Sequence, residues 1–249
     1  METNERNFRA DRYTPGNASK QQQQQADLWE IKTLERFANF THPMPIDKEV
    51  SWDKSRIIMS KTDKFGIIEY ANDTFIDVSG YEEHELMGMP HSIVRHPEMP
   101  KVLFKVLWDN LLAGNVVKPV VKNLSKSGRY YWVIADFEIK RNDKGEITSF
   151  YSRRKAVAPE VVAKVEGLYR KLLQIEQTSG VGASEKYLLG YLEDLNMSYN
   201  ELIEHLVMEY TPGLKGSKPA QSAPAAQAQQ SHSEPEPEKK GFFSRFFGW

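Results

Sequence analysis

Cysteine is absent from this chain of 249 residues. Without a thiol, the protein can form no disulfide bond, no thiolate metal site, no iron–sulfur cluster and no covalent adduct between a cysteine and a bound ligand. A cysteine nucleophile is excluded for the same reason. Any chemistry that the protein performs must therefore use other side chains or a bound molecule.

The chain also lacks a charge imbalance and long apolar runs. Its 33 lysine and arginine residues nearly balance 34 aspartate and glutamate residues, and no basic patch with interleaved aromatic residues suggests nucleic-acid binding. No stretch approaches the ~18 apolar residues of a membrane span, and the polar N-terminus has no signal-peptide pattern. We therefore expect a cytoplasmic protein that does not bind nucleic acid.

Signatures of common enzyme classes are missing as well. The chain has no Walker A loop, dinucleotide-binding fingerprint, kinase signature or paired-carboxylate arrangement. It has no histidine-kinase block, no cyclase or phosphodiesterase motif, and no long helical hairpin of the kind by which chemoreceptors contact their kinase. We expect a protein that is not an enzyme and whose output passes through a partner.

The two ends of the chain differ in composition from its middle. Residues 1–26 are polar and predict a disordered arm, whereas residues 27–41 carry an apolar stripe that predicts an amphipathic helix. Residues 212–240 are rich in proline, alanine, glutamine and serine and predict a disordered linker. The final segment, 241–249, predicts contact with a partner protein or an anionic membrane surface. Its aromatic residues are Phe242, Phe243, Phe246, Phe247 and Trp249.

Residues 45–157 predict an α+β domain. Their pattern gives two strands, short helices, one longer helix and then three strands. Asn72 or Asp73 can cap the first short helix, and Pro100 and Gly114 mark the two ends of the longer one. The expected strands are residues 57–59, 67–70, 116–124, 130–139 and 147–156.

Residues 158–211 predict a helical hairpin for dimerisation or output. Apolar residues follow heptad spacing from Val161 to Ile175 and again from Leu188 to Leu206. Gly180 to Gly182 break the pattern, and Ser184 can cap the second helix. The apolar stripe is too wide for the hairpin to cover alone. We expect it to pack on the central domain, on a second copy of the chain or on a partner.

A run of uncommon residues in the central segment resembles the PAS domains of bacterial aerotaxis receptors and of the stand-alone PAS proteins in bipartite energy-taxis systems. The resemblance covers close to half the chain and implies a PAS fold, with a five-stranded antiparallel sheet and one longer helix on one face. The matching segments include Asn72-Asp73-Thr74-Phe75, Ser79-Gly80-Tyr81, Arg95-His96-Pro97-Glu98-Met99-Pro100, Val121-Lys122-Asn123 and Tyr131-Trp132-Val133.

In flavin-binding members of this family, non-covalent FAD lies between the sheet and the helices. An arginine fork suits a pyrophosphate or a flavin carbonyl, and a tryptophan face suits a fused ring. The redox chemistry would belong to the cofactor, which the protein binds and tunes. The resemblance implies contacts from Arg95, His96, Glu98 and Trp108, with Asn72, Asn123 and His91 as further candidates.

One position departs from the family. FAD-binding members carry a second tryptophan after the glycine that ends the long helix, and Val117 stands there in this chain. Since that change removes a stacking face, haem or no cofactor are alternatives to FAD. His96 equally suits a structural hydrogen-bonding role, and Trp108 equally suits the core. His91 and His96 are spaced off one helical face, so we expect no metal site.

Two functions follow from these features. The first is a sensor of redox or energy state that binds flavin and signals to a separate chemoreceptor-like transducer. The second is a cofactor-free PAS adaptor, tethered to a partner, a membrane or a cell-pole complex by the aromatic tail.

Overall fold

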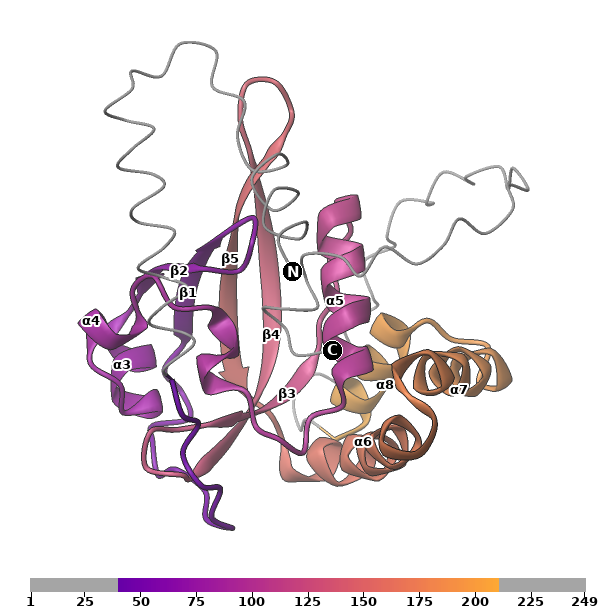
Figure 1. The fold of residues 1–249 in the computed structure, drawn as a ribbon. Helices are drawn as coiled ribbons and strands as arrows, with labels where there is room; N and C mark the ends of the chain where they lie inside the picture. Colours follow the sequence, from indigo (N-terminus) through magenta and orange to yellow (C-terminus); the bar gives the residue numbers. More distant parts are fainter. Residues whose placement is uncertain (1–39, 211–249) are drawn as a thin grey trace, which may run out of the picture.

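The computed structural model describes residues 40–210 (Figure 1). The predicted arm (1–26), nearly all of the predicted helix at 27–41, the linker and the aromatic tail lie outside the described residues. Phe40 and Thr41, which the predicted helix includes, are not helical.

A five-stranded antiparallel sheet forms the centre of the fold, with the strand order β2-β1-β5-β4-β3. This architecture confirms the α+β class and each of the five predicted strands. β3 begins later than expected, at Val120, because Pro119 offers no N–H to a sheet. β1 runs on to Asp63, whereas the prediction ended it at Met59. The strands are β1 (Ile58–Asp63), β2 (Ile68–Ala71), β3 (Val120–Leu124), β4 (Tyr130–Arg141) and β5 (Ile147–Ala156).

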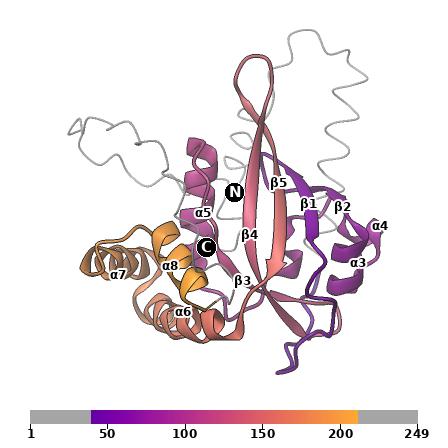
Figure 2. The same ribbon diagram turned by 180° about the vertical axis from the view of Figure 1, so that it is seen from behind.

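The chain between β2 and β3 supplies the helices that cover one face of the sheet (Figures 1 and 2). The side-chain oxygen of Asn72 accepts a hydrogen bond from the Phe75 N–H and starts the first helix, as the sequence predicts. Gly114, with φ of 86°, ends the longest one. The elements are α3 (Asp73–Ser79), α4 (Glu83–Leu86), the 3₁₀ helix η1 (His91–Val94) and α5 (Lys101–Ala113).

Three helices follow the sheet where the sequence predicts two. They are α6 (Pro159–Ser179), α7 (Val181–Asp194) and α8 (Tyr199–Tyr210). Asn196 has a φ of 50°, which ends α7. Ser198 and Glu201 then bond to each other's backbone N–H groups in a capping box that starts α8. The Ser-x-x-Glu spacing of this box was readable in the sequence.

The boundary between α6 and α7 also differs from the prediction. Only Gly180 separates the two helices, and Gly182 lies inside α7. Ser184 does not cap a helix. Its side chain is fully buried, and its hydroxyl donates to the carbonyl oxygen of Leu172 on α6, which holds the two helices together.

Of the three expected packing partners, the structure shows the central domain: α6–α8 pack against α5 and β3 (Figure 2). Tyr169 of α6 is buried, and its hydroxyl donates to the Val120 carbonyl of β3 at 2.7 Å. That proton is then committed, so the Tyr199 hydroxyl of α8, also 2.7 Å away, donates to Tyr169. One hydroxyl thus joins α6, α8 and the sheet.

A second junction links α6 to α5. The Glu176 carboxylate accepts hydrogen bonds from the backbone N–H groups of Lys101 and Val102, at 2.9 and 2.8 Å. Pro100, at the cap position of α5, has no side-chain acceptor of its own. Glu176 therefore completes the N-terminus of α5 from another element, where a carboxylate also meets the positive end of the helix dipole.

We predict that Tyr169→Phe lowers the free energy of unfolding by about 1–3 kcal/mol, because it leaves the buried Val120 carbonyl and Tyr199 hydroxyl without their partner. Urea unfolding followed by circular dichroism measures the change. Tyr187→Phe on α7 is the matched control, since Tyr187 is 39% exposed. Equal stability of the Tyr169 variant and the wild type would contradict this account of the junction.

Candidate functional site

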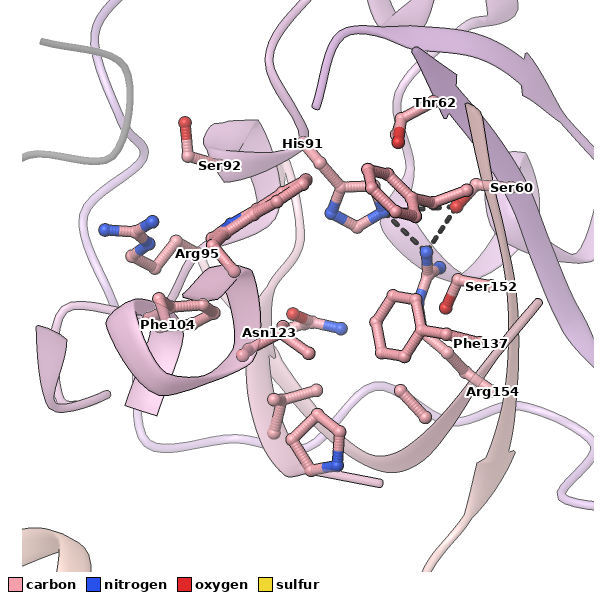
Figure 3. A pocket seen from close by; sticks show the side chains of 16 residues that line it. Ser60, Thr62, His91, Ser92, Arg95, Phe104, Asn123, Phe137, Ser152 and Arg154 are labelled. Atoms are coloured by element: carbon pink, nitrogen blue, oxygen red, sulfur yellow. Dashed lines mark hydrogen bonds between the residues drawn. The ribbon is translucent and has the colours of Figure 1, made fainter. Parts of the chain in front are cut away.

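A cavity of about 70 Å³ lies between the sheet and α5 (Figure 3). Inward-facing residues of β1, β3, β4 and β5 form one side, and η1 and α5 form the other. Phe104, Leu107 and Trp108 of α5 supply much of the apolar wall. Trp108 packs edge-on against Phe150 of β5, with ring centroids 5.6 Å apart. The cavity therefore has the aromatic walls that suit a flat ring.

Arg154 enters this cavity from the centre of the sheet. Strand β5 lies between β1 and β4, and its residues alternate, so that Phe150, Ser152 and Arg154 face inward. Arg154 as a whole is 3% exposed. Its Nη2 atom donates to the Ser60 hydroxyl of β1 and, at 2.6 Å, to Nε2 of His91 (Figure 3).

His91 is held as a neutral hydrogen-bond acceptor. A guanidinium nitrogen can only donate, so Nε2 of His91 accepts from Arg154 and the ring proton lies on Nδ1. Burial, and then the charge of Arg154, lower the pKa of His91 well below its usual value. The imidazole also stacks on Phe75, with centroids 5.5 Å apart. Ser60 and His91 together fix the orientation of Arg154.

The cavity carries positive charge and, among the described residues, no aspartate or glutamate lines it. Arg95 and Arg154 both contribute, and burial lowers the pKa of each to about 10, so both stay charged near neutral pH. The Nη1 atom of Arg154 and the Ser152 hydroxyl are buried without a hydrogen-bond partner. Buried polar atoms usually have a hydrogen-bond partner. The lining therefore suits an electron-rich ligand that accepts hydrogen bonds.

The candidates from the sequence divide between two places. His91, Arg95, Trp108 and Asn123 all line the cavity beside α5. Arg95 also lies over the Phe104 ring, with its guanidinium carbon 4.1 Å from the ring centroid.

His96 and Glu98 line a second, more polar cavity of about 530 Å³, between residues 45–47, β3, β4 and α6. A backbone bridge pairs Arg95 with Asn123, and because side chains alternate along such a segment, their neighbours His96 and Lys122 face the other way. Lys122 donates to Glu98 at 2.6 Å.

Asn72 and Val117 lie at neither cavity. The Asn72 oxygen accepts from the Met59 and Phe75 N–H groups, and its amide nitrogen donates to the Ile57 carbonyl. Asn72 therefore joins β1 to α3 and has little capacity left for a ligand. Val117, at the position of the family's second tryptophan, is 7% exposed and is not part of the cavity lining.

Sequence reasoning missed Arg154, Ser60 and Ser152. Arg154 lies in the run Arg153-Arg154-Lys155, which reads as a solvated charge cluster. The available signal was its spacing: it stands two and four residues after Ser152 and Phe150, on the buried face of an inner strand.

Two searches of the described residues bear on other kinds of site. Within residues 40–210, no three metal-binding side chains are grouped closely enough to hold an ion. None of the helices described is both long and apolar enough to cross a bilayer.

Comparison with known proteins identifies the domain. Residues 68–153 match the family model described as PAS fold. The chain is 39% identical over 132 residues to the aerotaxis receptor of Escherichia coli, an alignment that covers 53% of this chain and 26% of that protein. The sheet and its helices form a PAS domain. A bacterioopsin transcriptional activator of Halobacterium salinarum is 24% identical over 122 residues, 48% of this chain and 18% of the activator. The chain thus spans about a quarter or less of these relatives' lengths.

Solved structures with similar coordinates include PAS and LOV domains. The light-state structure of the blue-light photoreceptor aureochrome 1 LOV is 22% identical, with a TM-score of 0.38, and covers 49% of this chain and 91% of that one. The PAS domain of the fruit-fly ELK potassium channel is 20% identical, with a TM-score of 0.37, and covers 40% and 85%.

The PAS cavity matches a flavin in the chemistry of its lining but not in its free volume. The aromatic walls and the buried donors of Arg154 and Ser152 match the chemistry of a planar ring with carbonyl groups. The free volume of about 70 Å³ is small, because pockets for organic ligands usually reach about 300 Å³ or more. Three fused rings therefore enter only if side chains of the lining move apart.

We predict that His96 makes the protein sensitive to mild acid. Its Nδ1 accepts from the Glu98 N–H at 3.2 Å, and burial, then Lys122, lower its pKa from 6.5 to about 4. The unfolded chain takes up this proton near pH 6.5 and the folded chain only near pH 4. Stability therefore falls as the pH is lowered through this window, by about 1–3 kcal/mol.

Urea unfolding at several pH values between 7 and 4.5 checks this. His96→Gln should make the profile less steep without flattening it, because burial also lowers the pKa of His91. His84→Gln, at an exposed histidine, serves as the control. An unchanged slope in the His96 variant would show that the proton uptake occurs elsewhere.

Proposed function

We propose that this protein is a sensor of redox or energy state that binds FAD non-covalently in the PAS cavity and signals to a separate chemotaxis-type transducer. The observation that carries the proposal is the aromatic cavity whose lining contains the half-buried Arg95 and the buried Arg154 and no acidic residue. The relationship of the domain to the PAS region of an aerotaxis receptor supports it.

The cavity residues would have distinct roles toward the flavin. Trp108 and Phe150 would enclose the ring system. Arg95, which lies over Phe104 of α5, would supply a planar cationic group with several hydrogen-bond donors. Bound flavin would supply the electron acceptor and donor, and the chain would position it and exclude water.

The output would pass through the helices that dock on the domain. Helix α5 forms a wall of the cavity and is capped by Glu176 of α6. Strand β3 presents Asn123 to the cavity and is bonded through Val120 to Tyr169 of α6. A change in cavity contacts would thus reach α6 by two routes. The partner would be a separate signalling protein, contacted by α6–α8 or by the aromatic tail, which lies outside the described residues.

A second function is favoured by the small cavity. Side chains leave only about 70 Å³ free, and Val117 replaces the family's second tryptophan. If the lining does not open, the protein would act as a cofactor-free PAS adaptor that links partners through its helices and tail.

We predict that the purified chain is yellow, with a flavin band at ~450 nm. Trp108→Ala should lower the flavin content per chain several-fold while the protein stays folded, because the variant loses a wall of the cavity. Trp52→Ala, at a residue that lines neither cavity, is the control. Absorbance and chromatography of the released nucleotide measure the content. A colourless wild-type protein that also fails to take up added FAD would favour the adaptor.

We further predict that Glu176→Ala loosens the start of α5. The variant leaves the Lys101 and Val102 N–H groups without their acceptor, which costs about 0.5–2 kcal/mol for a lost helix cap. Hydrogen–deuterium exchange should accelerate in the first turn of α5. Glu185→Ala on α7, which breaks only the side-chain pair with Lys105, should leave that turn protected. Identical exchange in both variants would remove Glu176 from the output route.

A further inference from the structure

We propose that Arg154 is the specificity residue of the PAS cavity and bonds an electron-rich oxygen on the ring of the ligand. The inference rests on the proposed function for the identity of the ring as a flavin. It adds a residue outside the recognised sequence motif and a requirement on the ligand: the edge that faces β5 must carry a carbonyl or negatively charged oxygen.

The orientation of Arg154 is fixed before any ligand binds. Its Nη2 atom is held by Ser60 and His91, and the guanidinium lies 5.0 Å from the centroid of the Phe75 ring. Because a guanidinium is planar, these contacts also set the direction of Nη1. Nη1 is buried and has no hydrogen-bond partner. It belongs to a side chain that lines the cavity, as Figure 3 shows.

The charge of Arg154 has no counter-charge in the described part of the chain. Its hydrogen-bond partners are neutral, and no carboxylate pairs with it, whereas the exposed Arg56 bonds to Asp77 at 2.9 Å. A buried cation is costly unless a partner offsets the loss of water. A structural arginine would be expected to keep a carboxylate. An electron-rich ligand would supply the missing partner.

The surroundings favour a ring oxygen over a phosphate. Apolar and aromatic side chains, including Phe150, line much of the cavity, and Phe137 lies beside Arg154 (Figure 3). A phosphate would lose more water here than one arginine replaces, whereas a ring carbonyl fits between apolar walls and still accepts a hydrogen bond. The flavin ring has carbonyl oxygens on one edge, so Arg154 would donate a hydrogen bond to an oxygen on that edge.

The test compares Arg154→Met with Arg153→Met, its exposed neighbour on β5. Ligand-free full-length protein is titrated with FAD, with riboflavin, which has the ring without pyrophosphate, and with ADP-ribose, which has the pyrophosphate without the ring. We expect Arg154→Met to lower the affinity for FAD and for riboflavin equally. The expected loss is about 10- to 150-fold, which corresponds to one charged hydrogen bond. Arg153→Met should bind as the wild type does.

Thermal unfolding of the ligand-free variants separates recognition from a structural role. Arg154→Met removes an uncompensated buried charge, which favours the folded state, but it also leaves Ser60 and His91 without their donor. Because these two effects oppose each other, the melting temperature should change little. A large fall in the melting temperature would show that Arg154 is structural and overturn the inference. So would a loss of affinity for FAD and ADP-ribose that spares riboflavin, because it would place Arg154 at the pyrophosphate.

Failure of this inference is distinguishable from failure of the proposed function. If the wild type binds FAD and Arg154→Met binds it equally well, the sensor function stands and the role of Arg154 is wrong. If the wild type binds neither FAD nor riboflavin, the flavin function itself is wrong, and the assignment of Arg154 to a flavin ring falls with it. Arg154→Lys keeps the charge but loses the planar guanidinium group with its several donors, so it should retain part of the affinity for FAD.

Discussion

The buried guanidinium of Arg154 is the constraint around which the PAS cavity is organised. It sits on the central strand of the sheet and bonds to two neutral groups, Ser60 and His91. His91 must stay neutral to accept from it, and burial ensures this by lowering the pKa of the imidazole. A site of this kind is poorly suited to a cation and well suited to a ligand with an electron-rich edge.

Strand β3 and the chain segment paired with it separate two environments. Arg95 and Asn123 face the apolar cavity, while His96 and Lys122 face the polar one between the sheet and α6. The same strand offers its Val120 carbonyl to Tyr169. The C-terminal helices therefore contact the backbone of a strand whose side chains line the cavity. Under the proposed function, this geometry would let the C-terminal helices respond to a buried ligand without touching it.

Much of the fold was predictable from local chemistry. Asn72 caps α3, Gly114 ends α5, and tight turns separate the last three strands, each for a reason visible in the sequence. The third C-terminal helix was missed because the apolar spacing continues across Asn196, although the capping box of Ser198 was visible. Apolar periodicity alone does not reveal a single residue with positive φ.

The candidate site was predictable only in part. Arg95, Trp108, Asn123 and His91 meet at one cavity, but His96 and Glu98 face another, since adjacent residues of an extended segment point to opposite sides. Arg154 was hidden in a charged run, where only strand register tells which arginine is buried. The free volume of the cavity depends on side-chain packing across the whole domain, which no motif encodes.

An experimental structure of the full-length protein, purified with whatever it binds in the cell, tests the central claim most directly. The account predicts a planar ligand between the sheet and α5, with Trp108 against it and a ligand oxygen within about 3 Å of Nη1 of Arg154. A cavity closed by the protein's own side chains, with Nη1 bonded to the protein or to water, would contradict it.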